Sequence, residues 1–375
     1  MSDPVLDLIN KNSLAFSVSG RDYLIKCLNP DHEDSNPSFR VDKVSGVAHC
    51  FSCGFKTNLF KYYGVFTNPI PIKIAKLKEK LAFVKQIAAN QIFIGNGSDE
   101  CIDILFRTFC EPGKDNIIIC PPTYPMYEVS ANINDIAIQK APLLSDYQLN
   151  LAHIEQLVNP NTKIIWICSP NNPTGNSLDR IDIETILNHF NGIVVVDEAY
   201  INFSKQKSFV QSLIDYPNLV VLQTLSKAWG LAGLRLGMCF ASPQVIGFMN
   251  KVKAPYNINI VTQELALQAL DEVGQVNDMI KLLVDMRIAL AEVIGSMPHV
   301  IQVFPSDTNF ILVKIPKARQ LYEYLLSQGI IVRDRSALEL CEDSLRITVG
   351  TEQENTLLVD AMYQWITNTF ELTLN

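Results

Sequence analysis

Long apolar runs and a high density of charge are both missing from this sequence. Charged residues make up 19% of the 375 residues and hydrophobic residues 48%, which excludes a disordered or a collagen-like chain. The longest apolar runs, such as residues 164–168 and 193–196, are far shorter than the ~18 residues that a helix needs to cross a bilayer. The N-terminus also lacks the basic segment and apolar stretch of a secretory signal peptide. We therefore expect a soluble, cytoplasmic protein with no membrane partner.

The charge that is present is unevenly distributed along the chain, whose net charge is −8. Residues 1–89 hold 12 Lys and Arg against 8 Asp and Glu, whereas the remaining 286 residues hold 19 against 31. The length allows roughly two domains. A basic segment ahead of an acidic one therefore suggests two parts that have different partners.

The nine cysteines fall into two groups. Six are scattered in apolar segments, as reduced core residues are: Cys101, Cys110, Cys120, Cys168, Cys239 and Cys341. The other three lie near the N-terminus with a histidine, in the array Cys27-x4-His32-x17-Cys50-x2-Cys53. A Cys-x-x-Cys pair followed by Gly54 is typical of a turn that supplies two ligands of a tetrahedral zinc ion. The array predicts a structural Zn2+ site, and the alternative is three unconnected thiols with a surface histidine.

The residues between these ligands resemble the zinc-binding domain of bacterial and phage DNA primases. Pro37-Ser38-Phe39 and the run His-Cys-Phe-Ser-Cys-Gly at 49–54 match that family, although four residues instead of two separate the first ligand pair. The resemblance covers residues 20–64 and implies a zinc ribbon over residues 1–66 that contacts single-stranded nucleic acid. The acidic metal-binding core of a primase is missing from the rest of the sequence.

Basic and aromatic residues of the ribbon are compatible with phosphate contacts and base stacking: Arg40, Lys43, Lys56 and Lys61 with Phe39, Phe51 and Phe55. The alternative is that the aromatic side chains form the small core of the ribbon while the basic ones are merely solvated. A linker with a short helix is expected over residues 67–87, because two prolines interrupt 67–71 and apolar residues recur at helical spacing over 74–86.

From residue 92 onward, strand-like and helix-like segments alternate. Apolar, β-branched runs occur at 92–94, 116–120, 163–168, 192–196, 218–223 and 237–240. This alternation predicts an α/β fold with a largely parallel sheet that helices cover on both faces. Ligands of such sheets gather beyond the carboxyl ends of the strands.

Polar motifs follow four of these strands. The motifs are Gly-Asn-Gly-Ser-Asp-Glu at 95–100, Ser-Pro-Asn-Asn-Pro-Thr-Gly at 169–175, Val-Asp-Glu-Ala-Tyr at 196–200 and Thr-Leu-Ser-Lys-Ala-Trp-Gly-Leu-Ala-Gly-Leu-Arg at 224–235. The first can cradle an anion at a helix start. Singly, each motif is also an ordinary cap or turn, whereas four in this order on successive strand ends are much more specific.

Together with Leu-Arg-Ile-Thr-Val-Gly-Thr at 345–351, these motifs resemble the fold-type I aminotransferases that use pyridoxal 5′-phosphate (PLP), and most of all the histidinol-phosphate aminotransferases. The resemblance covers about three quarters of the chain. It implies a PLP-binding large domain over 88–255, a C-terminal part with a smaller α+β domain over 256–375, and a homodimer. The implied reaction is transamination of L-histidinol phosphate with 2-oxoglutarate in histidine biosynthesis. A threonine-phosphate decarboxylase, or a nucleic-acid-binding protein with an inactive aminotransferase fold, remains an alternative.

The resemblance also assigns roles to single residues. Lys227 matches the lysine that forms a Schiff base with PLP and, once released, moves a proton at the substrate Cα. Asp197 matches the acid that keeps the pyridine nitrogen protonated. Tyr200 and Asn172 would hydrogen-bond the phenolic oxygen. Tyr124 would stack on the ring, with a core tyrosine as the alternative.

The remaining assignments concern anions. Five residues would surround the cofactor phosphate: Ser98, Asp99, Thr224, Ser226 and Arg235. Arg346 matches the residue that binds the substrate α-carboxylate. Arg333 would face the substrate phosphate, with Arg335 as a substitute. For Arg333 and Arg335 the alternative is solvated charge at a strand end.

Two segments of the family's N-terminal arm do not occur in this sequence. They are an Asn-x-Asn-Pro segment and an Arg-Tyr-Pro segment, and the tyrosine of the second reaches the cofactor phosphate of the partner subunit. The resemblance therefore implies that the zinc ribbon takes the place of the arm. One wall of the substrate site and part of the dimer contact would then differ from those of the family.

Overall fold

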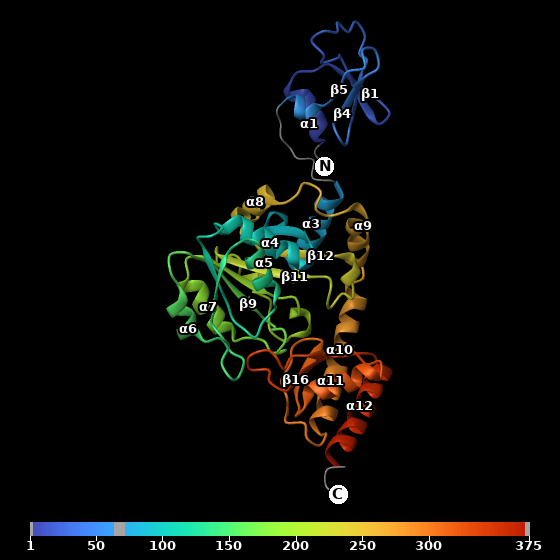
Figure 1. Ribbon diagram of the computed structural model, residues 1–375. Coiled ribbons are helices and arrows are strands. Elements are labelled where there is room, and N and C mark those ends of the chain that lie inside the picture. Colours follow the sequence, from blue (N-terminus) through green and yellow to red (C-terminus); the bar gives the residue numbers. More distant parts are fainter. Residues whose placement is uncertain (1–2, 64–71, 372–375) are drawn as a thin grey trace. The chain divides into compact units, whose positions relative to one another are not determined.

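The computed structural model describes residues 3–63 and 72–371 of the chain (Figure 1). The chain folds into two compact units, Met1–Ala75 and Lys76–Asn375. The predicted domain boundary at residue 66 and the proline-containing segment 67–71 lie outside the described residues.

The first unit is an antiparallel sheet with two short helices. Its strands are neighbours in chain order: β1 (Phe16–Ser19), β2 (Asp22–Ile25), β3 (Phe39–Asp42), β4 (Val47–Cys50) and β5 (Lys56–Asn58). Helix α1 (Pro4–Lys11) precedes the sheet and α2 (Leu59–Tyr62) follows it. The Asp3 carboxylate caps α1 by accepting hydrogen bonds from the backbone N–H groups of Val5 and Leu6.

This unit has a hydrophobic core of its own. Phe39 and Val41 on β3 are buried while Arg40 between them is exposed, as the alternation of side chains along a strand requires. The core residues are Val5, Leu8, Ile9, Tyr23, Ile25, Phe39, Val41, Ala48, Cys50, Leu59 and Phe60. The sequence predicted a zinc ribbon for this unit, but not the bounds or the order of its strands.

The second unit is built on a seven-stranded sheet in the order β6-β12-β11-β10-β9-β7-β8. The strands are β6 (Ile92–Asn96), β7 (Asn116–Ile119), β8 (Ala137–Lys140), β9 (Thr162–Cys168), β10 (Ile193–Asp197), β11 (Leu219–Thr224) and β12 (Leu236–Ala241). Strands β7 to β11 pair in parallel, whereas β12 is antiparallel to both of its neighbours. The predicted largely parallel sheet is confirmed.

Helices alternate with these strands. They are α3 (Ile72–Lys85), α4 (Ser98–Phe109), α5 (Met126–Ile133), α6 (Leu151–Leu157), α7 (Arg180–His189), α8 (Pro243–Val252) and α9 (Ile260–Ala269). Single 3-10 turns occupy Ala89–Gln91, Ile201–Phe203, Phe209–Ser212 and Ala232–Leu234. Buried side chains of α4, α5 and α8 form one hydrophobic cluster with the sheet. The predicted helix over 74–86 corresponds to α3.

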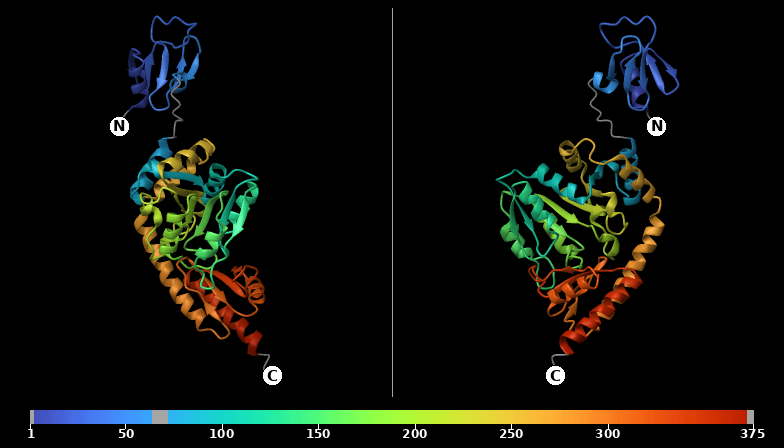
Figure 2. Two further views of the ribbon diagram at one scale, coloured as in Figure 1. Left: turned by 90° about the vertical axis from the view of Figure 1, so that its left-hand side faces the viewer. Right: turned by 45° about the vertical axis from the view of Figure 1, so that its right-hand side comes forward.

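A smaller α+β part ends the chain. The long helix α10 (Val273–Gly295) leads from the large sheet to a four-stranded antiparallel sheet (Figure 2). The order of that sheet is β13 (Gln302–Val303), β14 (Phe310–Lys314), β16 (Ser344–Thr348) and β15 (Arg333–Asp334). Its core includes residues of α10, α11 (Ala318–Ser327) and α12 (Glu352–Ile366), and a π-helical turn follows at Thr367–Glu371.

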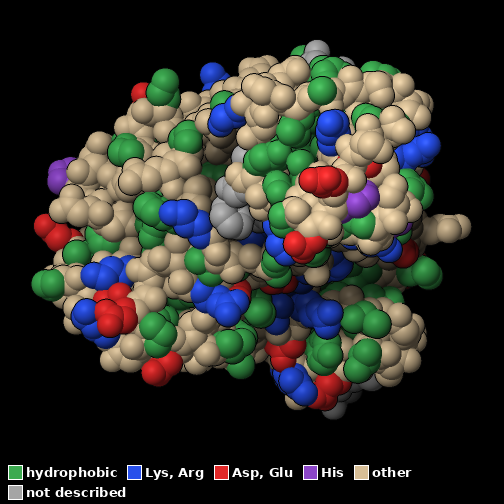
Figure 3. Space-filling model, turned by 90° about the horizontal axis from the view of Figure 1, so that it is seen from above, with side chains coloured by type: hydrophobic (Ala, Val, Ile, Leu, Met, Phe, Trp, Pro, Cys, Tyr) green, Lys and Arg blue, Asp and Glu red, His purple; other side chains and the backbone are tan. Residues whose placement is uncertain are grey.

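Acidic and basic side chains lie interspersed on the face drawn in Figure 3. Within residues 3–63 and 72–371, no helix combines the length and the apolar composition needed to cross a membrane.

Candidate active site and metal centre

The carboxyl ends of the strands bring the predicted cofactor residues around one cavity. Asp197 ends β10 and Thr224 ends β11, while Ser98 begins α4 just after β6. All ten residues that the resemblance assigned to the cofactor line the cavity: Ser98, Asp99, Tyr124, Asn172, Asp197, Tyr200, Thr224, Ser226, Lys227 and Arg235. This edge of an open parallel sheet is where ligands bind in such folds.

One end of the cavity is suited to an anion. Ser98 lies in the first turn of the 12-residue helix α4, where free backbone N–H groups carry partial positive charge. The hydroxyl oxygens of Thr224 and Ser226 lie 2.9 Å apart, and Arg235 lines the same cavity. Gly97 leaves room for that arginine, because a Cβ at Gly97 would lie 2.4 Å from Nη2 of Arg235. These donors fit a phosphate group.

The Asp99 carboxylate connects two of the other cofactor residues. One oxygen accepts a hydrogen bond from the Tyr124 hydroxyl at 3.0 Å, and the other accepts one from Nη2 of Arg235 at 3.3 Å. Burial and the charge of Asp99 raise the pKa of Tyr124. Asp99 therefore orients the predicted ring-stacking side chain and the predicted phosphate ligand.

Asp197 is a buried acid with two donors. Its side chain is 2% exposed. One carboxylate oxygen accepts from the Tyr127 hydroxyl at 2.7 Å and the other from the Ala199 backbone N–H at 3.0 Å. Burial raises the pKa of Asp197, and both hydrogen bonds act against that rise. The remaining lone pairs of the Asp197 carboxylate can accept a hydrogen bond from a protonated ring nitrogen.

The side chain of Lys227 lines the cavity. Nζ lies 5.3 Å from the centre of the Tyr200 ring. The cavity walls withdraw water from the amine and lower the pKa of Lys227, and the nearby Arg346 guanidinium lowers it further. A lysine with a lowered pKa has more of the free amine, which is the nucleophilic form.

Arg346 on β16 reaches the same site from the smaller sheet. It donates from Nη1 to the Asn172 side-chain oxygen at 2.7 Å, and its guanidinium carbon lies 4.8 Å from the centre of the Phe310 ring. Burial lowers the pKa of Arg346, and its buried Nε has no hydrogen-bond partner. An unpartnered guanidinium N–H beside the cavity fits a carboxylate or phosphate ligand.

The other two predicted arginines differ in their surroundings. Arg333 pairs directly with Arg346 across β15 and β16 and is exposed. Arg335 is half-buried. Burial raises the pKa of the Tyr200 hydroxyl, whereas the charges of Arg346 and Arg335 lower it. The charges of Arg333, Arg335 and Arg346 thus act on one another, which is costly without an anion between them.

Sequence reasoning missed three residues of this site. Cys168 and Ala199 line the cavity, and Tyr127 donates a hydrogen bond to Asp197. Tyr127 lies on α5, whereas Tyr124 precedes that helix. Their rings lie 5.6 Å apart in an edge-to-face arrangement.

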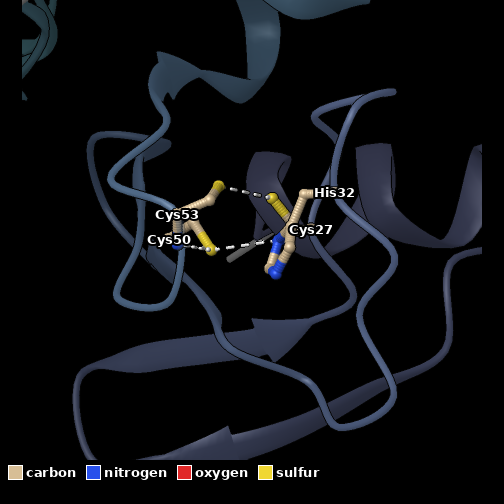
Figure 4. A group of neighbouring side chains, drawn as sticks. All are labelled: Cys27, His32, Cys50 and Cys53. Atoms are coloured by element: carbon tan, nitrogen blue, oxygen red, sulfur yellow. Dashed lines mark hydrogen bonds between the residues drawn. The ribbon is translucent and has the colours of Figure 1, made fainter.

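The four predicted metal ligands of the first unit come together. The ligand atoms of Cys27, His32, Cys50 and Cys53 all lie within 4.8 Å of one another (Figure 4). Sγ of Cys27 and Sγ of Cys53 are 3.7 Å apart, as are Sγ of Cys50 and Nδ1 of His32. Tetrahedral zinc with ligands at 2.0–2.3 Å requires ligand atoms about 3.3–3.8 Å apart. The donor set and its spacing therefore fit Zn2+.

Neighbouring groups hold these ligands in place. The Cys53 backbone N–H donates to Sγ of Cys50 at 3.4 Å, and Oγ of Ser38 lies 3.2 Å from the same sulfur. The Asp34 carboxylate accepts from the backbone N–H of Cys27 at 2.9 Å. Such outer contacts orient the ligands of structural metal sites.

The ribbon aromatics divide between the core and the surface. Phe39 is fully buried and stacks on the partly buried Phe55 at 5.9 Å between ring centres, so these two pack the core. Phe51 is 67% exposed. Its ring lies 4.7 Å from that of His49, and the Arg40 guanidinium lies 5.5 Å from its centre. Of the three predicted stacking residues, Phe51 alone is available to a base.

Two family models match the chain. One, described as Aminotransferase class I and II, matches residues 64–362, and the other, described as CHC2 zinc finger, matches residues 3–85. The histidinol-phosphate aminotransferase of Cytophaga hutchinsonii is 51% identical over 286 residues, which is 76% of this chain and 82% of that protein. The protein of the same name from Parabacteroides distasonis is 48% identical over 287 residues, 76% of this chain and 83% of that protein.

Solved structures share the fold of the second unit. The histidinol-phosphate aminotransferase of Clostridium acetobutylicum superposes with a TM-score of 0.74 at 21% identity, covering 80% of this chain and 90% of that one. The enzyme of the same name from Sinorhizobium meliloti, solved with pyridoxal 5′-phosphate, gives a TM-score of 0.72 at 23% identity, covering 79% and 82%. The family model, these relatives and the lysine-aspartate cavity agree, and the chain belongs to the class I and II aminotransferases.

Proposed function

We propose that the second unit transfers the amino group of L-histidinol phosphate to 2-oxoglutarate with PLP as cofactor, as in histidine biosynthesis. The observation that carries the proposal is one cavity that combines a free amine, a buried carboxylate and an anion pocket: Lys227, Asp197 and the pocket formed by Ser98, Ser226 and Arg235. Relatives that are 46–51% identical and are named histidinol-phosphate aminotransferase support this substrate.

The residues of the cavity fit PLP. The anion pocket would hold the phosphate, and the doubly hydrogen-bonded Asp197 carboxylate would hold the ring nitrogen. Tyr200 and Asn172 would bond the phenolic oxygen, and Tyr124 would cover the ring. When bound, PLP supplies a protonated ring that accepts the electrons left on the substrate Cα after its proton departs.

Lys227 performs the proton transfer in this proposal. Its lowered pKa keeps more of its side chain as the free amine, which can attack a carbonyl carbon and can also accept a proton. With substrate bound, Nζ of Lys227 would remove the proton from the substrate Cα. The nearby Arg346 charge supports both functions by disfavouring a second cation.

The arginines explain how one site serves two anionic substrates. Histidinol phosphate carries a phosphate ester beside its amine-bearing carbon, whereas 2-oxoglutarate carries one carboxylate on its keto carbon and a second at the end of its chain. Arg346, with its free Nε, would bind the anion nearest the reacting carbon. Arg335 and Arg333, whose charges act on Arg346, would bind the outer anionic groups.

Absorption spectroscopy tests this function. Purified full-length protein is mixed with PLP and then with histidinol phosphate, beside the Lys227→Ala variant. We expect a cofactor band in the near-visible range that needs Lys227 and shifts when histidinol phosphate is added. O-phosphothreonine is the competing substrate, and carbon dioxide release from it would favour the decarboxylase instead. A cofactor band that does not shift when histidinol phosphate is added would refute the proposed substrate.

The proposal includes an assignment of parts. We assign residues 88–255 to cofactor binding and residues 256–375 to the part that contains the smaller sheet, and we infer a homodimer from the family. Sedimentation of the full chain at several concentrations measures the dimer.

We further propose that the first unit binds zinc and contacts single-stranded nucleic acid. The match to the CHC2 zinc finger model and the four convergent ligands support the metal. The exposed Phe51, flanked by Arg40 and His49, supports a surface on which one base stacks beside a phosphate contact.

Binding of labelled single-stranded DNA to the full chain tests this second proposal. We expect affinity that falls steeply with salt and that is lost when Cys50 and Cys53 are both changed to Ser. Cys110→Ser is the matched control, because Cys110 is a partly buried thiol outside the ligand cluster. Binding that survives the double change would count against the ribbon as the nucleic-acid site.

A further inference from the structure

Tyr127 is a buried tyrosine whose hydroxyl meets the acid of the cofactor site. It lies on α5, is fully buried, and donates to Oδ2 of Asp197 at 2.7 Å. The other oxygen of Asp197 accepts from the Ala199 backbone at 3.0 Å. Each carboxylate oxygen therefore has one fixed donor, and these two contacts set the plane of the group.

An aromatic stack fixes the position of this hydroxyl. The Tyr127 ring lies 4.8 Å from that of Trp166 on β9 at an interplanar angle of 19°. Trp166 in turn lies 5.2 Å from Phe106 on α4 at 25°. Trp166 thus packs against the Tyr127 ring and is itself backed by Phe106, which restricts movement of the hydroxyl away from Asp197.

The hydroxyl is not needed for packing. A phenylalanine would form the same stack and would avoid the free-energy cost of burying a polar group. A buried tyrosine hydroxyl offsets that cost only by making a hydrogen bond. The Tyr127 hydroxyl lies near the Cys168 thiol, and it donates a hydrogen bond of ordinary length to the Asp197 carboxylate. The polar atom at this position is therefore explained chiefly by its bond to Asp197.

We propose that Tyr127 is a positioning residue for the cofactor ring, which orients the Asp197 carboxylate and keeps it ionised opposite the ring nitrogen. The proposal rests on the PLP-dependent function proposed above. A donor to Asp197 lowers the pKa of that acid, so the shared proton stays on the ring nitrogen. Without the donor, the acid becomes more basic and draws the proton toward itself.

Other charged or titratable groups also face Asp197. Lys227 lowers the pKa of Asp197 and Asp99 raises it, while Asp197 raises the pKa of Cys168 on β9. Replacing Tyr127 with phenylalanine removes one oxygen atom and leaves the ring, Lys227 and Asp99 in place. The Tyr127 hydroxyl also interacts with the Cys168 thiol, so the variant Tyr127→Phe removes that contact together with the hydrogen bond to Asp197.

Two ligands separate a positioning role from a structural one. The first is PLP and the second is its analogue in which a C–H group replaces the ring nitrogen. We expect Tyr127→Phe to weaken the binding of PLP about tenfold or more. The same change should weaken the binding of the carbon analogue by less than about twofold. With ring-labelled PLP, the 15N resonance should move toward the position of an unprotonated pyridine.

Tyr147→Phe is the matched control. Tyr147 is also buried, but its hydroxyl donates to the Leu340 carbonyl at 2.8 Å and not to Asp197. The Tyr147→Phe variant should have the same ratio of the two ligand affinities and the same 15N resonance as the unchanged protein. Equal losses for both ligands in Tyr127→Phe, or an unmoved 15N resonance, would overturn the positioning role. Failure of the unchanged protein to bind PLP would instead overturn the proposed function, and this inference with it.

Discussion

Lys227 is surrounded by charges that act on its amine in opposite directions. Loss of water and the Arg346 guanidinium lower its pKa, whereas Asp197 and Asp99 raise it. The net effect is a lowered pKa, so the amine loses its proton at a lower pH than an ordinary lysine does. Arg346 thereby affects the chemistry of Lys227 as well as the binding of an anion.

Replacing Arg346 should therefore move the pH dependence of Lys227 in a definite direction. In Arg346→Gln the cation is gone, so the pKa of Lys227 rises. Capture of PLP requires the unprotonated amine, and its rate should increase with pH along a curve displaced to higher pH. The rate is followed by growth of the cofactor absorption band between about pH 6 and pH 10.

Arg319→Gln serves as the control for this change. Arg319 is an exposed cation that bonds Glu323 and Asp334, and its loss should leave the curve in place. A curve for Arg346→Gln that coincides with that of the unchanged protein, or lies at lower pH, would contradict the electrostatic role of Arg346.

At the scale of elements, the anion pocket depends on a close approach between two segments. Strand β12 passes directly against the turn from β6 to α4. A Cβ at Gly237 would lie 2.2 Å from both the Gly97 carbonyl carbon and the Ser98 nitrogen. The helix start that is proposed to hold the phosphate can reach its position only because β12 has no side chain at Gly237.

Gly237→Ala should therefore damage both stability and cofactor binding. The clash is with backbone atoms, and relieving it should cost about 1–3 kcal/mol of unfolding free energy. Because relief moves the turn at Ser98, PLP affinity should fall as well. Urea unfolding and PLP titration measure the two effects.

Gly247→Ala is the matched change on α8. A Cβ at Gly247 meets nothing within 4 Å, so alanine should leave stability unchanged or raise it by up to about 1 kcal/mol. If Gly237→Ala and Gly247→Ala had the same free energy of unfolding, the close approach would not explain why a glycine occupies position 237.

The sequence predicted the strands of the large sheet where consecutive residues of a strand are all buried. Runs such as Ile164–Ile165–Trp166 are buried on both faces, and their β-branched composition predicted strands correctly. Strand β8 (Ala137–Lys140) was missed because it lies at the sheet edge, where it is short and partly exposed. The antiparallel direction of β12 was also not predicted, because apolar composition does not encode strand direction.

The site was predictable to the extent that its residues belong to contiguous motifs. Lys227 and Asp197 lie in runs that resemble a family. Tyr127 meets Asp197 from 70 positions away along the chain, and only the packing of α5 on the sheet brings them together. The choice between core packing and base stacking for Phe39 and Phe51 likewise needed the structure, because strand alternation alone does not say which face is covered.

At the scale of the whole molecule, the two compact units have separate hydrophobic cores. The core of the first unit consists of residues between Val5 and Phe60, whereas two clusters of the second unit begin at Phe93 and at Leu290. The proposed zinc ligands belong to the first unit, and the lining of the proposed cofactor cavity belongs to the second. Metal and cofactor should therefore stabilise different parts of the chain.

Removal of the metal should then affect one unit and not the other. Binding of structural zinc contributes directly to folding of a small domain, so a chelator should lower or abolish one calorimetric transition of the full chain. The transition that PLP raises should stay at its temperature, and the cofactor absorption band should persist. Metal analysis before and after treatment should show the loss of one zinc per chain.

The double change of Cys50 and Cys53 to Ser distinguishes chelation from side effects of the chelator. This variant should lack the zinc-dependent transition from the outset, and the chelator should alter nothing further. The contrary outcome is loss of the PLP band, or a lower temperature for the PLP-dependent transition, after zinc is removed. The ribbon would then support the aminotransferase fold. It would then take the place of the family's N-terminal arm, since the described residues that line the cavity all lie at Ser98 or beyond.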